Sequence, residues 1–191
     1  MTDSSILWYA NRATGAVCLV LFTTVILLGL AVRLRGRLGL PRFGTVTLHR
    51  TLSLSAVVFL AAHIGAAVLD GYVNISVADV LVPFVSDYQP LWLGLGTVAF
   101  DLMLAVLVTS LLRARLGHRA WRAVHWLAYA SWPLALVHGI GIGTDSATGW
   151  MVWLTVACMA AVLAGSALRV LHAARAARRT PAALLRTAEG A

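Results

Sequence analysis

Charged residues are scarce in this chain, and their scarcity excludes a soluble globular protein. Only 12% of the 191 residues are charged and 60% are hydrophobic, and the mean hydropathy is +0.86. A soluble domain of this composition would aggregate. The net charge of +8 does not indicate a nucleic-acid-binding protein, because the basic residues stand in short blocks between apolar runs. The composition therefore predicts an integral membrane protein.

Cysteine is also scarce, since the chain has only Cys18 and Cys158, and both lie within apolar runs. Two thiols in such positions exclude a disulfide framework, and the Cys-x-x-Cys-His motif of covalently attached haem does not occur. A glycine-rich phosphate loop and zinc-ligand spacing are missing as well. Residues 1–7 lack the pattern of a signal peptide, so we expect them to be a mature tail.

Long apolar runs are what the sequence has instead. A bilayer core of about 30 Å needs roughly 20 helical residues to cross it. Five stretches meet this requirement, at residues 13–32, 47–70, 91–112, 121–141 and 150–171. We therefore expect an all-α integral membrane protein, a bundle of five transmembrane helices. Its membrane domain would cover residues 13–171, between an N-terminal tail (1–12) and an Arg/Ala-rich tail (172–191).

The distribution of arginine orients this bundle. Arginine residues gather after the first, third and fifth apolar stretches, whereas the other connections carry Asp70, Asp79, Asp87 and Asp145. Basic connections stay on the cytoplasmic side of a membrane. We therefore expect an N-out, C-in topology in a bacterial plasma membrane, with residues 1–12 outside and residues 172–191 in the cytoplasm.

Four of the six histidines lie inside predicted spans: His49 and His63 in the second, His125 and His138 in the fourth. An ionisable residue is costly in hydrocarbon and marks a candidate functional site. The spacings of 14 and 13 residues separate the members of each pair by about 20 Å along a helix. The two spans run parallel in the predicted topology, so His49 lies level with His125 and His63 lies level with His138.

Two levels of paired imidazoles predict two non-covalent b-type haems, an inner one on His49 and His125 and an outer one on His63 and His138. At about 100° per residue, 14 steps return to within about 40° of the same helix face, but 13 steps end about 140° away. The fourth span must therefore be irregular, and Pro133 permits a kink there. The alternative is that the histidines serve in packing or proton transfer.

The local sequences resemble the ferric reductase-like transmembrane domain of NADPH oxidases, ferric reductases and bacterial relatives. The similar segments are LWYANRATGAVCLVLF (7–22), LHRTLSLSAVVFLAAHIGA (48–66), LVPF (81–84) and GHRAWRAVHWLAYASWPLALVHGIGIGTD (117–145), and they look like the bacterial, actinobacterial-like branch. The resemblance covers residues 7–171. It implies that His49, His63, His125 and His138 ligate haem b iron and pass electrons across the membrane.

The chain also departs from the larger relatives, which carry FAD and nicotinamide domains after the last helix and have six spans. Only about 20 residues follow Arg169, so we expect an oxidoreductase component whose electrons come from a cytoplasmic reductase, a flavoprotein or membrane quinol. The resemblance implies an extracytoplasmic acceptor: ferric iron, oxygen, or a partner such as an FMN-binding protein. The alternatives are a non-catalytic docking subunit of a redox complex, or a one-haem subunit of a system similar to methionine sulfoxide reductase.

Residues near the span ends and between the histidine levels complete the prediction. Arg50 and Arg122 stand beside the inner histidines and could hold the inner haem propionates, although anchoring at the cytoplasmic surface explains them as well. Arg12 opposes the charge rule and, together with Tyr9, is a candidate partner for the outer propionates, although contact with lipid headgroups explains it equally well. The intramembrane Asp101 is a candidate for proton handling or for a protonated structural group.

Aromatic side chains and one short helix supply further expectations. Trp132 and Phe59 could each fill the space between the macrocycles, although core packing explains them equally well. We expect no ligand role for His118 and His172. The segment from Ser76 to Phe84 reads as a short interfacial helix with a serine cap and Pro83 as its stop.

Overall fold

The computed structural model describes residues 3–38, 42–71, 73–143 and 147–188, and every regular element among them is an α-helix. The helices are α1 (Asp3–Leu38), α2 (Arg42–Leu69), α3 (Val77–Leu81), α4 (Pro90–Leu111), α5 (Arg113–His125), α6 (Leu127–Ile142) and α7 (Gly149–Ala188). The expected all-α class is confirmed. The first helix begins at Asp3, so residues 3–12, which we predicted to be an N-terminal tail, form the first turns of α1.

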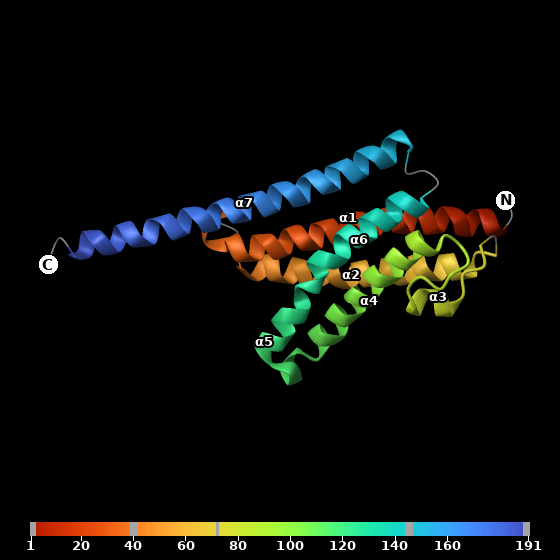
Figure 1. Ribbon diagram of the computed structural model, residues 1–191, viewed down its shortest axis with the longest axis horizontal. Coiled ribbons are helices and arrows are strands. Elements are labelled where there is room, and N and C mark those ends of the chain that lie inside the picture. The colour runs from red at the N-terminus through yellow and green to blue at the C-terminus, as the bar shows by residue number, and fades with distance from the viewer. Residues whose placement is uncertain (1–2, 39–41, 72, 144–146, 189–191) are drawn as a thin grey trace.

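Among the described residues, four helices are long and apolar enough to cross a membrane. The spans lie at Ser5–Val32 in α1, Phe43–Leu69 in α2, Pro90–Leu111 in α4 and Gly149–Ala177 in α7. The fifth span that we predicted, at residues 121–141, is instead divided between α5 and α6, and α6 has only 16 residues. The protein is thus a multi-pass membrane protein with four long spans and one shorter helix beside them (Figure 1).

The division between α5 and α6 lies at Trp126, immediately after His125. The N–H of Trp126 donates to the carbonyl of Ala123 (3.3 Å) and the N–H of Tyr129 donates to the carbonyl of Trp126 (3.0 Å). Such bonds between residues three apart wind the chain by about 120° per residue in place of about 100°. The tighter winding reduces the angular offset that an ideal helix would leave between His125 and His138. We expected this irregularity at Pro133, but α6 continues through that proline.

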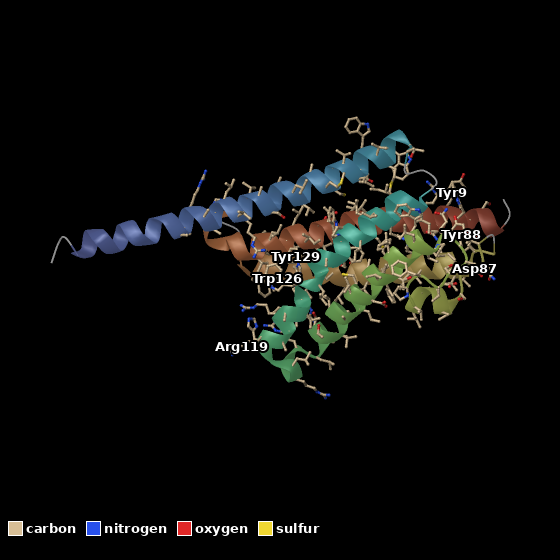
Figure 2. All side chains as sticks on the ribbon, viewed as in Figure 1. Tyr9, Asp87, Tyr88, Arg119, Trp126 and Tyr129 are labelled. Carbon is tan, nitrogen blue, oxygen red and sulfur yellow. The ribbon has the colours of Figure 1, made fainter. Side chains whose placement is uncertain are left out.

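The helices assemble as two antiparallel pairs. The α1–α2 pair and the α4–α6 pair have the most extensive packing, and α7 lies along α1 (Figure 1). One end of the bundle contains the beginning of α1, the short α3 and the end of α6, and the other end contains α5 and the beginning of α2. Figure 2 shows Tyr9, Asp87 and Tyr88 at the first end and Arg119 and Trp126 toward the second. The acidic and the Arg-rich connections therefore lie at opposite ends.

Helix α3 has the start that its sequence predicts. The hydroxyl of Ser76 accepts a bond from the N–H of Asp79 (3.3 Å), and the Asp79 carboxylate accepts one from the N–H of Ser76 (2.8 Å). This reciprocal capping box satisfies two donors that would otherwise lack partners. The Thr97 hydroxyl donates to the Asp79 carbonyl (2.8 Å) and attaches α3 to α4. The predicted short helix before Pro83 is therefore confirmed.

The outward helix surfaces are apolar, as a bilayer requires. On α2, Val58 is 67% exposed and Leu54 is 50% exposed, and on α7 Trp153 is 74% exposed. In water such surfaces would be an aggregation hazard, whereas lipid chains solvate them without cost. The side chains that point inward are mostly small, among them Ala56, Ala66 and Ala99, and small residues let transmembrane helices approach closely.

Candidate functional site

The histidines of α2 both face α1. The Nδ1 atom of His49 lies 3.1 Å from the carbonyl oxygen of Val25, and the Nδ1 atom of His63 lies 3.0 Å from that of Asn11. A carbonyl oxygen only accepts, so in both rings Nδ1 carries the proton and donates it. In a neutral imidazole the other nitrogen, Nε2, then keeps its lone pair and is available to a metal ion.

His138, on α6, is held in the same way by α4. Its Nδ1 atom lies 2.8 Å from the carbonyl oxygen of Trp92, which again leaves Nε2 with the free lone pair. His125 ends α5, and its ring lies beside the ring of Trp121, with centroids 4.9 Å apart. The indole N–H of Trp121 donates to the Ser110 hydroxyl on α4 (3.3 Å), so that α4 supports the residues around His125 as well.

The structure brings the four histidines together in the combinations expected from their spacing. The ring centroids of His49 and His125 are 6.3 Å apart, with 61° between the ring planes. His63 and His138 line one common cavity. In each combination one ring belongs to α2. The other ring belongs to α5 (His125) or to α6 (His138). The two combinations lie at opposite ends of the helices, because the histidines of each segment are several helical turns apart.

The spacing of the inner rings fits a haem iron. An imidazole nitrogen lies about 2 Å from a metal ion that it ligates, and the ring centroid lies about 1 Å farther away. Two imidazoles on opposite sides of one ion therefore have centroids about 6 Å apart, close to the 6.3 Å between His49 and His125. A porphyrin would supply the four remaining ligands. Among the described residues, no group of three or more His, Cys, Asp and Glu side chains could hold a metal ion without it.

The cavity between the helix pairs surrounds the outer histidines. Its volume is about 360 Å³, within the range of about 300–1,000 Å³ for cofactor and ligand sites. Its walls come from α1, α2, α4, α6, the beginning of α7 and the segment around α3, and they are largely apolar. Gly15 and Gly96 line it beside His63 and His138, where the absence of side chains leaves room for the rings.

Arg12 is the charged residue of α1 at this cavity. It belongs to the lining, and its guanidinium lies 4.4 Å from the ring centroid of Trp8, a stacking contact that Arg makes readily. Tyr9, which we grouped with Arg12, is 58% exposed and contacts Trp8. The structure thus places Arg12, but not Tyr9, on the cavity wall.

The other predicted residues divide between the interior and the surface. Trp132 lines the cavity, and its indole N–H donates to the Thr23 hydroxyl on α1 (3.0 Å). Phe59 is 38% exposed and lies with Val58 in a shallow groove on the outer face of α2. Phe59 is not among the residues that line the cavity around the outer histidines, whereas Trp132 is.

The remaining cationic candidates lie at the other end of the bundle. Arg50 and Arg122 are exposed, each in the helix that carries its neighbouring inner histidine. His118 is exposed in the Arg-rich segment of α5. Asp101 lies in α4 and is not among the residues that line the cavity.

Sequence reasoning missed three glycines, Gly15, Gly29 and Gly96, that lie against histidine rings. A signal was present in the sequence, because the interval from Gly15 to Gly29 equals the interval from His49 to His63. Because α1 and α2 are antiparallel, these equal intervals place Gly15 opposite His63 and Gly29 opposite His49.

Comparison with known proteins identifies a family. A family model described as "Ferric reductase like transmembrane component" matches residues 14–137, well over half of the chain. The matched range includes His49, His63 and His125 and ends one residue before His138. No curated protein and no solved structure gives a significant match.

Proposed function

The chain belongs to the family of ferric reductase like transmembrane components, and we propose that it carries electrons across the membrane through two b-type haems. The family and the multi-pass helical fold support transmembrane electron transfer. The observation that carries the two-haem proposal is the pairing of histidines from different helices at two levels. His49 faces His125 at 6.3 Å, and His63 and His138 share one cavity.

In this proposal the protein holds each iron between two neutral imidazoles. His49 and His125 would hold the inner haem, and His63 and His138 would hold the outer haem, each through Nε2. The backbone carbonyls of Val25, Asn11 and Trp92 accept the Nδ1–H of three of these rings, which fixes the tautomer and raises the basicity of the ligand. Haem iron supplies one-electron chemistry, with a potential set by its axial ligands and its surroundings.

Other residues of the chain orient the cofactors and exclude water. Arg12 is the proposed partner of the outer propionates, and Arg50 and Arg122 are the proposed partners of the inner ones. The indole of Trp132 is held in the cavity wall by its bond to Thr23. In the sequence, Trp132 lies between His125 and His138. The apolar lining limits the access of water to the irons.

The proposed direction of electron transfer is from the Arg-rich end to the end that contains α3. Basic connections mark the cytoplasmic side, so a cytoplasmic reductase or membrane quinol would reduce the inner haem. The acceptor would meet the outer haem from the extracytoplasmic side, as ferric iron, oxygen or a redox protein such as one that binds FMN. We place the protein in a bacterial plasma membrane.

A haem count tests the proposal. The full chain would be purified in detergent, and haem would be measured by the pyridine haemochrome method and by the dithionite-reduced minus oxidised spectrum. We expect two haems b per chain, and about one in His63→Ala and in His125→Ala. His118→Ala is the matched control, because His118 is exposed in the Arg-rich segment, and it should retain two. No haem after expression with adequate haem supply would reject the proposal and leave a docking subunit.

A further inference from the structure

One contact recurs three times between a histidine ring and a glycine on the neighbouring helix. The first instance joins α1 and α2. A Cβ atom at Gly15 would lie 3.1 Å from Cε1 and 3.3 Å from Nδ1 of His63. The Nδ1 atom of this ring is 3.0 Å from the carbonyl oxygen of Asn11, which stands one helical turn before Gly15. Because Gly15 has no side chain, the ring can reach that carbonyl.

The second instance uses the same two helices at the inner level. A Cβ atom at Gly29 would lie 3.6 Å from Cε1 of His49, and the Nδ1 atom of His49 is 3.1 Å from the carbonyl oxygen of Val25. Val25 again stands four residues before the glycine. Helices α1 and α2 are antiparallel, so two glycines on one helix match two histidines at the same interval on the other.

The third instance joins α4 and α6 and is the tightest. A Cβ atom at Gly96 would lie 2.5 Å from Nδ1 of His138, a distance that no side chain tolerates. The Nδ1 atom is 2.8 Å from the carbonyl oxygen of Trp92, four residues before Gly96. The α1–α2 pair and the α4–α6 pair thus hold their histidines by one geometry.

From this repeated geometry we propose that Gly15, Gly29 and Gly96 are positioning residues for the axial ligands: each keeps a helix surface open so that the ring donates Nδ1–H to the preceding carbonyl and directs Nε2 toward iron. The inference rests on the proposed function for the identity of the ligand. The orientation itself depends only on the backbone and the ring. Donation from Nδ1 raises the basicity of Nε2 and stabilises the ferric state.

The fourth histidine differs at the corresponding register position. Gly96 and His138 lie opposite one another on the antiparallel α4 and α6. Counting 13 residues from each of them reaches Thr109 on α4 and His125 at the end of α5, which is a different helix from α6. The Thr109 hydroxyl donates to the carbonyl of Ala105 (2.7 Å), four residues earlier. No described glycine has the ring of His125 among its nearest atoms within 4 Å, and we assign the glycine arrangement to three ligands only.

The three glycines differ in how much room they leave, and this difference predicts a graded response to alanine. In Gly96→Ala the ring of His138 must move, and in Gly15→Ala the ring of His63 must yield by a few tenths of an ångström. In Gly29→Ala the methyl group makes ordinary contact with His49. Loss of a partner that orients a metal ligand typically costs about 10- to 100-fold in metal affinity. We expect losses of this size for Gly96→Ala, smaller ones for Gly15→Ala and almost none for Gly29→Ala.

Gly94→Ala is the matched control for Gly96→Ala. Both residues lie on α4, and a Cβ atom at Gly94 would lie 2.2 Å from the ring of Phe84, which is not a ligand. Both variants disturb packing, but only Gly96→Ala disturbs His138. The outer haem of Gly96→Ala should have lower affinity and a higher midpoint potential, because the ferric form loses its more basic ligand. Gly94→Ala should keep the wild-type potential.

Nitrogen NMR of histidine-labelled protein, purified in detergent without haem, tests the inference independently of haem binding. We expect the Nδ1–H tautomer at His49, His63 and His138, assigned with the single His→Gln variants, and its loss at His138 in Gly96→Ala. The Nε2–H tautomer at these rings in the wild type, or an unchanged tautomer and haem affinity in both Gly96→Ala and Gly15→Ala, would overturn the inference. If the Gly96→Ala protein is not obtained in folded form, the tautomer and the haem affinity of Gly15→Ala decide whether the inference holds. The expected tautomers without any haem binding would reject the proposed function alone.

Discussion

The ring of His49 on α2 and the ring of His125 at the end of α5 have centroids 6.3 Å apart. His49 belongs to the α1–α2 pair, whereas His125 leads into the α4–α6 pair. A ligand bound between these rings would therefore connect the two helix pairs, which also meet through the packing of α1 on α6 and the bond between Trp132 and Thr23. The cofactor would be part of the fold as well as of the electron path.

The first prediction is that haem stabilises the folded chain. A ligand that binds only the folded state adds about 2.7 kcal/mol at 100 times its dissociation constant. Haem-loaded protein should therefore unfold at a higher temperature than haem-free protein, and His49→Ala should lose part of this difference. Thermal unfolding in detergent, followed by circular dichroism, measures it, with His118→Ala as the control. Equal stabilisation by haem in the wild type and in the His49→Ala, His63→Ala double variant would contradict the prediction.

Much of the candidate site could be predicted from the sequence, because helix geometry converts spacing into depth. The intervals from His49 to His63 and from His125 to His138 predicted which histidines the fold brings together. The charge distribution correctly predicted that the acidic and Arg-rich connections lie at opposite ends. These inferences needed only the rise per residue and the length of a span.

The rest depends on contacts between helices. The interval from His125 to His138 showed that the fourth segment must be irregular, but proline was the wrong indicator. The tight turn lies at Trp126. The Trp126 ring contacts α7, where the Arg169 guanidinium lies 5.3 Å from the ring centroid. Phe59 stands four residues before the inward-facing His63 but is 38% exposed, which the sequence does not indicate. Three glycines remained unrecognised because their role requires a ring on the opposite helix.

The second prediction concerns Arg12 and the outer haem. A hydrogen bond to a charged group contributes about 1.5–3 kcal/mol, so Arg12→Gln should weaken binding of the outer haem by on the order of 10-fold. The loss of a positive charge should also lower its midpoint potential, because reduction adds a negative charge. Redox titration with haem quantification tests both effects, and Arg12→Lys should recover part of each. Arg115→Gln is the control, since Arg115 is exposed on α5; an equal effect there would reject a local role for Arg12.

The third prediction concerns the bond between Trp132 and Thr23. The indole N–H donates to the hydroxyl across 3.0 Å, and Thr23 is only 5% exposed. Thr23→Val should lower the unfolding free energy by about 1–3 kcal/mol, because it leaves a donor without its partner in an apolar surrounding. Trp132→Phe in the Thr23→Val background should cost less than it does alone. Denaturation of the four proteins in detergent measures the coupling, and strictly additive effects would show that the bond contributes nothing.

The last prediction is the orientation of the bundle in the membrane. Both native cysteines are buried, so a cysteine introduced at an exposed position can be labelled over a low background. Asp87, in the connection between α3 and α4, and Arg115, in α5, are both exposed and lie at opposite ends. A membrane-impermeant maleimide should label Asp87→Cys in intact cells but reach Arg115→Cys only after permeabilisation, because basic segments remain in the cytoplasm. The reverse pattern would invert the topology, and the outer histidine pair would then face the cytoplasm.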